Sequence, residues 1–154
     1  MKLLLVRHGE AAAGASDGER PLTEKGRAEV LKVARFLKAG GTGLKAIYHS
    51  KKKRAIQTAE ILRQVLNPLA AMNSKAGLAP DDPVDDILYE ISSWNENTML
   101  VGHLPFLSHL VSRLVIGDPS RSIVSMDTGS VVILESADHK KWYVTGFVHP
   151  TLIT

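Results

Sequence analysis

The stretch Lys2-Leu3-Leu4-Leu5-Val6-Arg7-His8-Gly9-Glu10 decides how the rest of the chain is interpreted. It opens with an apolar run of strand length, and Gly9 is a turn signal at its end. Such a run without polar alternation is typical of a parallel strand that is buried on both faces. In open α/β sheets ligands bind outside the carboxyl ends of the strands, and Arg7 and His8 stand at such an end.

Arg7 and His8 together suit a phosphoryl group. A guanidinium holds anionic oxygens in pairs, and an imidazole can attack phosphorus. Gly9 would let the backbone turn tightly beside the anion. The same residues are also compatible with a plain strand end that carries a surface arginine and a capping histidine. The remainder of the chain has to decide between these two interpretations.

Length and composition narrow the class of protein. The chain has 154 residues, of which 44% are hydrophobic and 23% charged, so we expect residues 1–154 to form one soluble globular domain. The chain has no cysteine, which excludes disulfides, thiolate metal sites and cysteine catalysis. The first apolar run is too short for a signal peptide, and no run reaches the length of a membrane span. These features predict a cytoplasmic protein.

The net charge of +3 is mildly basic. A charge of this size favours anionic substrates and is too small to indicate nucleic-acid binding. We therefore expect neither a nucleic acid nor a membrane as a partner. The sequence leaves the oligomeric state open, and a monomer is compatible with it.

Strand and helix patterns alternate through residue 115. Further strands are predicted at residues 45–49 and 98–102, with a weak one within 70–78. Helices are predicted at residues 24–39, 51–66 and 81–94, and from 105 onwards. Two β-like runs at 130–134 and 142–148 predict a hairpin at the end of the chain. The pattern indicates a three-layer α/β/α sandwich whose mostly parallel sheet is mixed, with an antiparallel edge.

Three of the predicted strands end in residues suited to an anion. The first ends in Arg7 and His8. The second ends in Ser50, with Arg54 one turn into the next helix, and the third ends in His103. Parallel neighbours open at one edge of a sheet, so these side chains should converge there beside helix N-termini, which add partial positive charge. The set indicates a pocket for a dianionic phosphoryl group, and without a carboxylate cluster it predicts no metal and no cofactor.

Four stretches in order resemble the motifs of the histidine phosphatase superfamily, which includes the cofactor-dependent phosphoglycerate mutases. Residues 5–10 resemble its Arg-His-Gly signature, and residues 20–26 its Pro-Leu-Thr-x-x-Gly loop and helix start. Residues 50–59 resemble its second-arginine helix, and residues 101–105 its second-histidine strand end. The short chain, without a large helical insertion, is most similar to the SixA-type phosphohistidine phosphatases. The resemblance implies a phosphoglycerate mutase-like fold.

The resemblance also implies roles for the matched residues. His8 would be the nucleophile that becomes phosphorylated on a ring nitrogen, and water would then hydrolyse phospho-His8. The other catalytic candidates, which would bind the phosphoryl oxygens, are Arg7, Arg54 and His103. Candidates for substrate binding are Gly9, Arg20 and Ser50. Arg20 occupies the arginine position before Pro-Leu-Thr in SixA-type sequences and would contact the substrate phosphate or the partner protein.

Two departures from the family pattern leave alternatives open. Ser50-Lys51 replaces the usual Ser-Pro, and the lysine run 51–53 is either a solvated charge run or a docking surface for an acidic partner. Residues 77–82, where mutase-like members carry a proton-donor glutamate, contain none. Asp81 and Asp82 are candidates for that general acid, or they cap the third helix.

The leading hypothesis is a phosphatase for phosphohistidine on a protein, such as a phosphotransfer domain of a signalling relay. The chain has no insertion long enough to build a lid over the pocket. A first alternative is a phosphatase for a small phosphorylated metabolite. A second is a non-catalytic phospho-binding module, but such a module has no need of His8. A mutase is disfavoured because it requires a closed site that retains its intermediate away from water.

Overall fold

The computed structural model describes residues 1–14 and 16–154. The strands of this part are β1 (Lys2–Arg7), β2 (Ala46–His49), β3 (Ala71–Ser74), β4 (Thr98–Gly102), β5 (Val131–Glu135) and β6 (Tyr143–Val148). The α-helices are α1 (Glu24–Gly40), α2 (Lys53–Leu66), α3 (Asp85–Ile91) and α4 (Phe106–Ile116). Two short 3-10 helices are η1 (Asp17–Glu19) and η2 (Pro150–Leu152).

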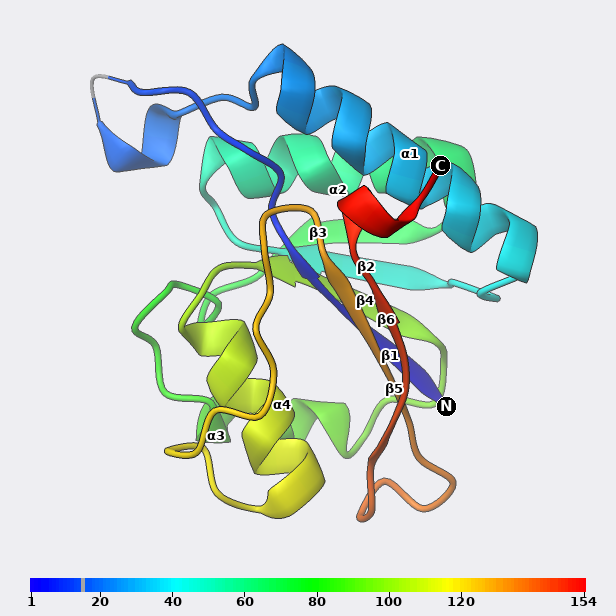
Figure 1. The fold of residues 1–154 in the computed structure, drawn as a ribbon. Helices are drawn as coiled ribbons and strands as arrows, with labels where there is room; N and C mark the ends of the chain where they lie inside the picture. The colour runs from blue at the N-terminus through cyan, green and yellow to red at the C-terminus, as the bar shows by residue number, and fades with distance from the viewer. Residues whose placement is uncertain (15) are drawn as a thin grey trace.

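The strands form one mixed sheet in the order β3-β2-β4-β1-β5-β6 (Figure 1). The first four strands along this order are parallel neighbours. β5 pairs antiparallel with β1, and β6 pairs antiparallel with β5. The predicted hairpin therefore supplies the antiparallel edge, and the prediction of a mixed, mostly parallel sheet is confirmed.

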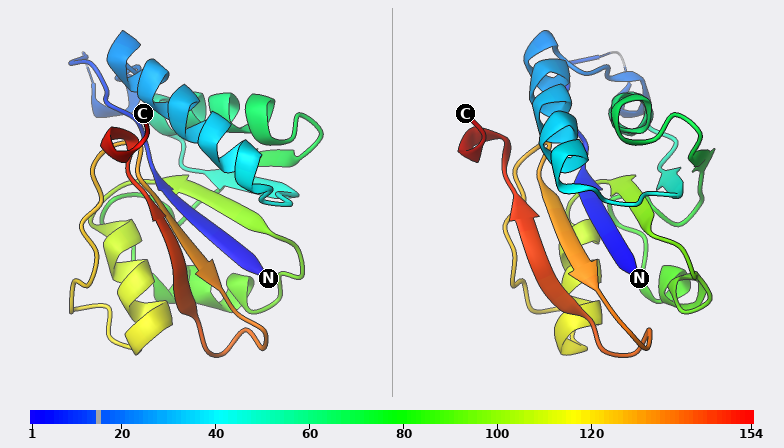
Figure 2. Two further views of the ribbon diagram at one scale, coloured as in Figure 1. Left: turned by 45° about the vertical axis from the view of Figure 1, so that its right-hand side comes forward. Right: turned by 90° about the vertical axis from the view of Figure 1, so that its right-hand side faces the viewer.

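Helices cover both faces of the sheet, with α1 and α2 on one face and α3 and α4 on the other (Figure 2). The side chains of β1 alternate between the two layers, as the period of a strand requires. Leu4 and Val6 belong to the core beneath α1 and α2, whereas Leu3 and Leu5 belong to the core beneath α3 and α4. This arrangement confirms the α/β/α sandwich.

Helix α1 begins and ends where its sequence predicts. The Thr23 side chain accepts a hydrogen bond from the backbone N–H of Gly26, and Gly41 ends the helix in the left-handed region with φ of 68°. A Cβ atom on Gly26 would lie 2.3 Å from the backbone oxygen of Glu10. Glycine is therefore required where α1 crosses the segment that follows β1.

The predicted start of α2 is wrong. The helix begins at Lys53 rather than at Lys51, and its N-cap residue Lys52 forms no side-chain capping bond. Ser50 precedes the helix, but its hydroxyl is directed toward His103. Arg54 consequently lies at the second position of α2, closer to the helix start than the sequence suggested.

The third helix is also shorter than predicted. It begins at Asp85 with Val84 as its N-cap, and it ends at Ile91. Asp82 accepts a hydrogen bond from the backbone N–H of Ala79 at 2.8 Å and so stabilises a turn ahead of the helix. Asp81 and Asp82 therefore do not cap α3, and that alternative is wrong.

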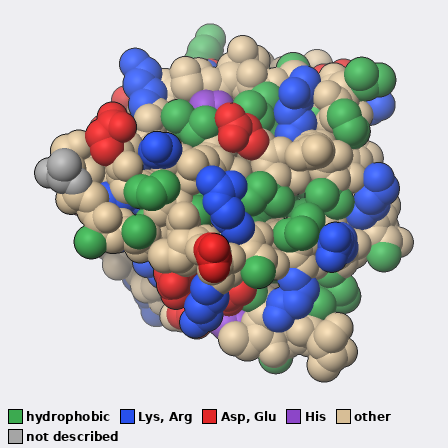
Figure 3. Space-filling model, turned by 90° about the horizontal axis from the view of Figure 1, so that it is seen from above, with side chains coloured by type: hydrophobic (Ala, Val, Ile, Leu, Met, Phe, Trp, Pro, Cys, Tyr) green, Lys and Arg blue, Asp and Glu red, His purple; other side chains and the backbone are tan. Residues whose placement is uncertain are grey.

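The outer face of α1 is charged and exposed, as its helical period predicts. Seen from above, Lys and Arg side chains are spread over this face and mixed with acidic and apolar ones (Figure 3). They do not gather into one basic patch on the face shown. Within the described residues, no helix combines the length and the apolar character needed to cross a membrane.

Candidate active site

The carboxyl ends of β1, β2 and β4 meet at one edge of the sheet. In the register of the sheet, Arg7 lies opposite Gly102, and His49 lies opposite Val101. A cavity of about 360 Å³ opens at this edge. Its lining includes Arg7, His8, Arg20, Arg54 and His103. The structure thus brings together the two arginines and two histidines from three separate strand ends.

The His8 ring is held in one tautomer. Its Nδ1 lies 2.7 Å from the backbone oxygen of Gly9, a contact that requires a proton on Nδ1. Nε2 is then unprotonated, and it accepts a hydrogen bond from Arg54 Nε at 3.3 Å. The pKa of His8 is lowered to about 4, chiefly because the ring is buried. The hydrogen bond to the Gly9 carbonyl raises the pKa in part, and the Arg54 charge lowers it. A neutral imidazole with a free lone pair is the form that attacks phosphorus.

The backbone around His8 is fixed from two sides. The N–H of His8 donates to Gly102 O at 3.0 Å, and the N–H of Gly129 donates to His8 O at 3.0 Å. Thr58 Oγ1 accepts from the N–H of Gly9 at 3.0 Å and donates to Arg54 O at 2.7 Å. Thr58 therefore couples the loop after β1 to the first turn of α2.

Gly9 serves packing rather than the tight turn predicted for it. Its φ is not positive, and a Cβ atom would lie 2.8 Å from Val30 Cγ2 and 3.1 Å from Leu22 Cδ2. Its N–H and carbonyl bond within the protein, to Thr58 and His8. Gly9 thus positions His8 from outside the cavity lining.

Arg7 and Arg54 line the cavity from two different elements, the end of β1 and the first turn of α2. Arg7 Nη1 donates to Met126 O at 2.7 Å, and Arg7 Nε is buried without a partner among the described residues. Arg54 is 5% exposed, and its Nη1 donates to Asp17 O at 2.7 Å. Arg54 Nη2 lies 3.3 Å from the Asp17 carboxylate. Both guanidiniums are therefore held in place by backbone carbonyls.

His103 lies beside His8, with ring centroids 5.1 Å apart. Ser50 Oγ and His103 Nε2 are 2.5 Å apart, and His103 Nδ1 is buried without a partner among the described residues. Burial lowers the pKa of His103 to about 3, and the His8 and Arg54 charges contribute. Ser50 therefore reaches the site through His103, and it lines a neighbouring groove rather than the cavity itself.

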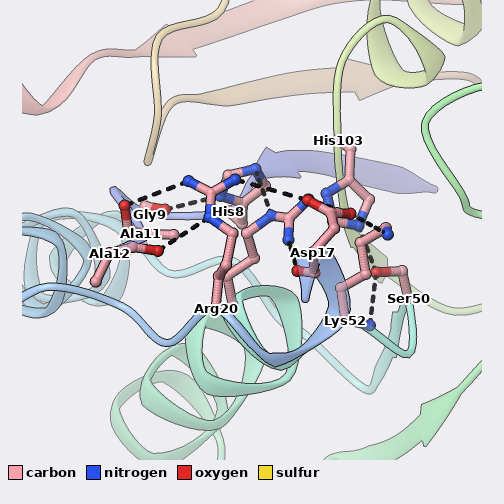
Figure 4. Close-up of polar contacts among 10 residues, drawn as sticks. His8, Gly9, Ala11, Ala12, Asp17, Arg20, Ser50, Lys52 and His103 are labelled. Atoms are coloured by element: carbon pink, nitrogen blue, oxygen red, sulfur yellow. Dashed lines mark hydrogen bonds and ion pairs between the residues drawn. The ribbon is translucent and has the colours of Figure 1, made fainter. Parts of the chain in front are cut away.

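Arg20 lines the cavity from the loop before α1. Its Nε donates to Ala12 O at 2.9 Å, and its Nη1 lies 3.6 Å from the Asp17 carboxylate. Figure 4 shows Asp17 between Arg20 and Lys52. Sequence reasoning did not single out Asp17, because two of its three partners, Lys52 and Arg54, lie 35 and 37 residues away along the chain and no motif marks it.

Neither proton-donor candidate lines the cavity. Asp81 is exposed, and Asp82 lines the neighbouring groove of about 310 Å³, whose other lining residues include Ser50, Lys51, Lys52 and Lys75. From this segment Pro80 reaches the cavity. Of the described lining residues, Glu10 alone carries a carboxylate, and its Oε1 accepts from Thr23 Oγ1 at 2.9 Å.

The lysine run 51–53 divides in the structure. Lys52 forms an ion pair with Asp17. Lys51 and Lys53 are exposed, and neither has an ion-pair partner in the described part of the chain. Both interpretations of the run, solvated charges and a docking surface, stay open. Across residues 1–14 and 16–154, no three His, Asp or Glu side chains are grouped as a metal site would require.

The fold and the cavity are those of an α/β protein that gathers histidines and arginines around one cavity at the carboxyl edge of its sheet. The chain belongs to the histidine phosphatase superfamily (branch 1), whose family model matches residues 3–79. An uncharacterized protein of Picosynechococcus sp. (strain ATCC 27264 / PCC 7002 / PR-6) is 31% identical over 160 residues, which cover 94% of this chain and 96% of that protein.

Solved structures share the whole fold. The protein histidine phosphatase SixA in complex with tungstate superposes with a TM-score of 0.91 and 24% identity over 100% of both chains. The alpha-ribazole phosphatase of Shigella flexneri superposes with a TM-score of 0.79 and 18% identity over 97% of both chains. The predicted SixA-like, phosphoglycerate mutase-like fold is confirmed. Membership of the superfamily supports phosphatase activity and leaves the substrate open.

Proposed function

We propose that this chain is a single-domain, metal-independent phosphatase that removes the phosphoryl group from phosphohistidine on a protein, through a covalent intermediate on His8. The observation that carries the proposal is the state of His8. Its Nδ1 is bound to the Gly9 carbonyl and its unprotonated Nε2 contacts Arg54 at 3.3 Å. A nucleophile and a phosphate ligand are thus held side by side, and superfamily membership supports the same chemistry.

The first step transfers the phosphoryl group to the enzyme. The lone pair of His8 Nε2 forms a bond to phosphorus as the bond from phosphorus to the substrate imidazole breaks. The leaving imidazole keeps that electron pair and departs neutral, because its second nitrogen is already protonated. Arg7 and Arg54 neutralise the equatorial oxygens in the transition state.

The second step releases the phosphate. Water attacks phosphorus, the bond to Nε2 breaks, and phosphate leaves with the oxygen and protons of the water. His8 returns to its neutral form with the proton on Nδ1, which the Gly9 carbonyl holds throughout. For His103 to bind a phosphoryl oxygen through Nε2, its 2.5 Å contact with Ser50 must be shared or replaced.

The arrangement of carboxylates supports phosphohistidine over an ordinary phosphoester. Expelling an alkoxide normally requires a general acid. Asp81 and Asp82 lie outside the cavity lining, and Glu10 is engaged with Thr23. An imidazole with a pKa of roughly 6.5 leaves without such help. A phosphohistidine-bearing protein is therefore the proposed partner, ahead of a small phosphorylated metabolite.

The test compares leaving groups in the same buffer with EDTA present. The probes are a histidine-containing carrier protein phosphorylated with phosphoramidate, glucose 6-phosphate and a nucleoside monophosphate. We expect kcat/KM for the phosphoprotein to exceed the others by about 100-fold or more, in line with the contribution of a general acid. Protein that is denatured with detergent at alkaline pH during turnover should carry alkali-stable, acid-labile phosphate on His8.

Other outcomes would redirect the assignment. Preference for either small ester would favour the metabolite alternative, and binding of phosphate without turnover of any probe would favour a phospho-binding module. Label on Ser50 would contradict the assignment of His8. Loss of activity in EDTA that magnesium restores would contradict the metal-independent mechanism.

A further inference from the structure

Asp17 places a carboxylate beside the cavity, where it meets three cations, two of which are the lining residues Arg20 and Arg54. Its carboxylate forms ion pairs with Lys52, with Arg54 Nη2 at 3.3 Å and with Arg20 Nη1 at 3.6 Å. The hydrogen bond from Lys52 lowers the pKa of Asp17 to about 2, and Arg54 contributes to the lowering. The group is therefore a full negative charge at neutral pH.

Each nitrogen of the Arg54 guanidinium contacts a protein group. Its Nε faces His8 Nε2, its Nη1 donates to the backbone oxygen of Asp17, and its Nη2 faces the Asp17 carboxylate. A phosphoryl group in line with His8 Nε2 needs donors from this same guanidinium. It also brings further negative charge close to the carboxylate, and like charges at such range repel each other.

We propose that Asp17 is an internal counter-ion that competes with the phosphoryl group for Arg54 and so keeps the affinity of the site for phosphate low. This inference rests on the proposed function only for the identity of the anion. The competition assists turnover, because the Asp17 carboxylate can form its ion pair with Arg54 again as the product phosphate leaves. Asp17 thereby sets how tightly the site holds an oxyanion, while His8 carries the chemistry.

The neighbouring acidic residue of the same turn provides a matched control. Glu19 also lies on η1 and is exposed, and within the described residues it forms no ion pair. Changing Glu19 to Gln removes the same charge from the same turn without touching Arg54. Changing Asp17 to Asn keeps an oxygen that accepts from Lys52 and leaves the backbone bond to Arg54 Nη1 in place.

The experiment measures the dissociation constant of inorganic phosphate by calorimetry for the unaltered protein, Asp17→Asn and Glu19→Gln, with circular dichroism to check folding. We expect Asp17→Asn to bind phosphate about tenfold more tightly, as removal of one nearby charge implies. Glu19→Gln should stay within about twofold of the unaltered protein. Product inhibition by phosphate should strengthen in Asp17→Asn by the same factor.

Two results would overturn the proposal. Weaker phosphate binding in Asp17→Asn, or in a second variant Asp17→Ala, would show that the carboxylate orders Arg54 instead of competing for it. Equal tightening in Glu19→Gln would reduce the effect to general surface charge. Because phosphate binding is measured without turnover, failure to hydrolyse phosphohistidine would contradict the proposed function and leave this result standing.

Discussion

Two neighbouring concave sites at the carboxyl edge of the sheet both carry positive charge, yet only one is suited to a phosphoryl group. In the groove, Lys75 pairs with Glu90 and lies 5.1 Å from the centre of the Tyr48 ring, and Lys52 pairs with Asp17. In the cavity, the arginines are planar donors held by backbone carbonyls beside a neutral imidazole. Positive charge alone does not define the proposed site; rigid donors next to the proposed nucleophile His8 do.

The largest expected effect comes from removing His8, the proposed nucleophile. His8→Ala should lower kcat for the phosphoprotein by at least about 10⁴-fold, the scale seen when a covalent nucleophile is deleted. The fold should persist, because His8 lies at a strand end and the core of β1 is formed by its leucines. His109→Ala, at an exposed position of α4, is the control and should keep full activity. Turnover in His8→Ala near the level of that control would remove His8 from the mechanism.

The difference between cavity and groove is tested by replacing one cationic residue of each with alanine. Arg54→Ala should lower kcat/KM by roughly 10²–10³-fold, the usual cost of one transition-state donor. Lys75→Ala removes an ion pair and a cation–π contact from the groove, and should change kcat/KM by less than about threefold. Similar losses in both variants would mean that the groove also binds the reacting part of the substrate.

The buried histidines should make stability depend on pH. Burial lowers the pKa of His8 to about 4 and of His103 to about 3, from the ordinary 6.5. As pH falls below about 6.5, the unfolded chain takes up protons that the folded chain does not, so the free energy of unfolding decreases. Between about pH 5.5 and 4.5 each histidine should contribute a decrease of up to about 1.4 kcal/mol per pH unit.

Urea unfolding of the unaltered protein, His8→Asn and His103→Asn at several pH values measures this slope. In each variant the free energy of unfolding should fall less steeply with decreasing pH than in the unaltered protein. The difference in slope is the contribution of the histidine that was replaced. Parallel curves for all three proteins would show that neither imidazole is held neutral by the fold.

Much of the fold and the central set of site residues followed from sequence because the signals are local or topological. Five apolar residues without polar alternation define β1, and the helical period of Val30, Val33 and Leu37 identifies the buried face of α1. Parallel strands open at the same edge, so Arg7, His8 and His103 could be placed together before any contact was known. The carbonyl that holds the His8 ring belongs to Gly9, its neighbour in the chain.

Predictions from the sequence were wrong or missing where a side chain contacts residues that are distant along the chain. Serine is a common residue at helix N-caps, but the Ser50 hydroxyl contacts His103, 53 residues away. Asp17 has no local pattern, and its bonds to Lys52 and Arg54 depend on how the loop before α1 folds back. Gly9 is required by the nearby Val30 side chain, a tertiary contact that no turn rule contains.

The smallest expected effect concerns the groove carboxylates and sharpens the choice of substrate. Asp82 accepts from the N–H of Ala79 at 2.8 Å, and Asp81 is exposed; neither lines the cavity that holds His8. Asp81→Asn and Asp82→Asn should therefore lower kcat for the phosphoprotein by less than about tenfold, against the 10²–10⁴-fold that a general acid contributes. Asp118→Asn, far from both sites on the loop after α4, serves as the charge-matched control.

The same variants assayed on glucose 6-phosphate make the result decisive. If the segment that carries Asp82 moved to protonate an alkoxide, the loss would be confined to the ester and absent with phosphohistidine, whose imidazole leaves neutral. A loss of about 100-fold or more on both substrates, in a folded variant, would instead make that aspartate the acid of the enzyme. The preference would then pass to a small phosphoester, because only such a leaving group requires the proton that the aspartate supplies.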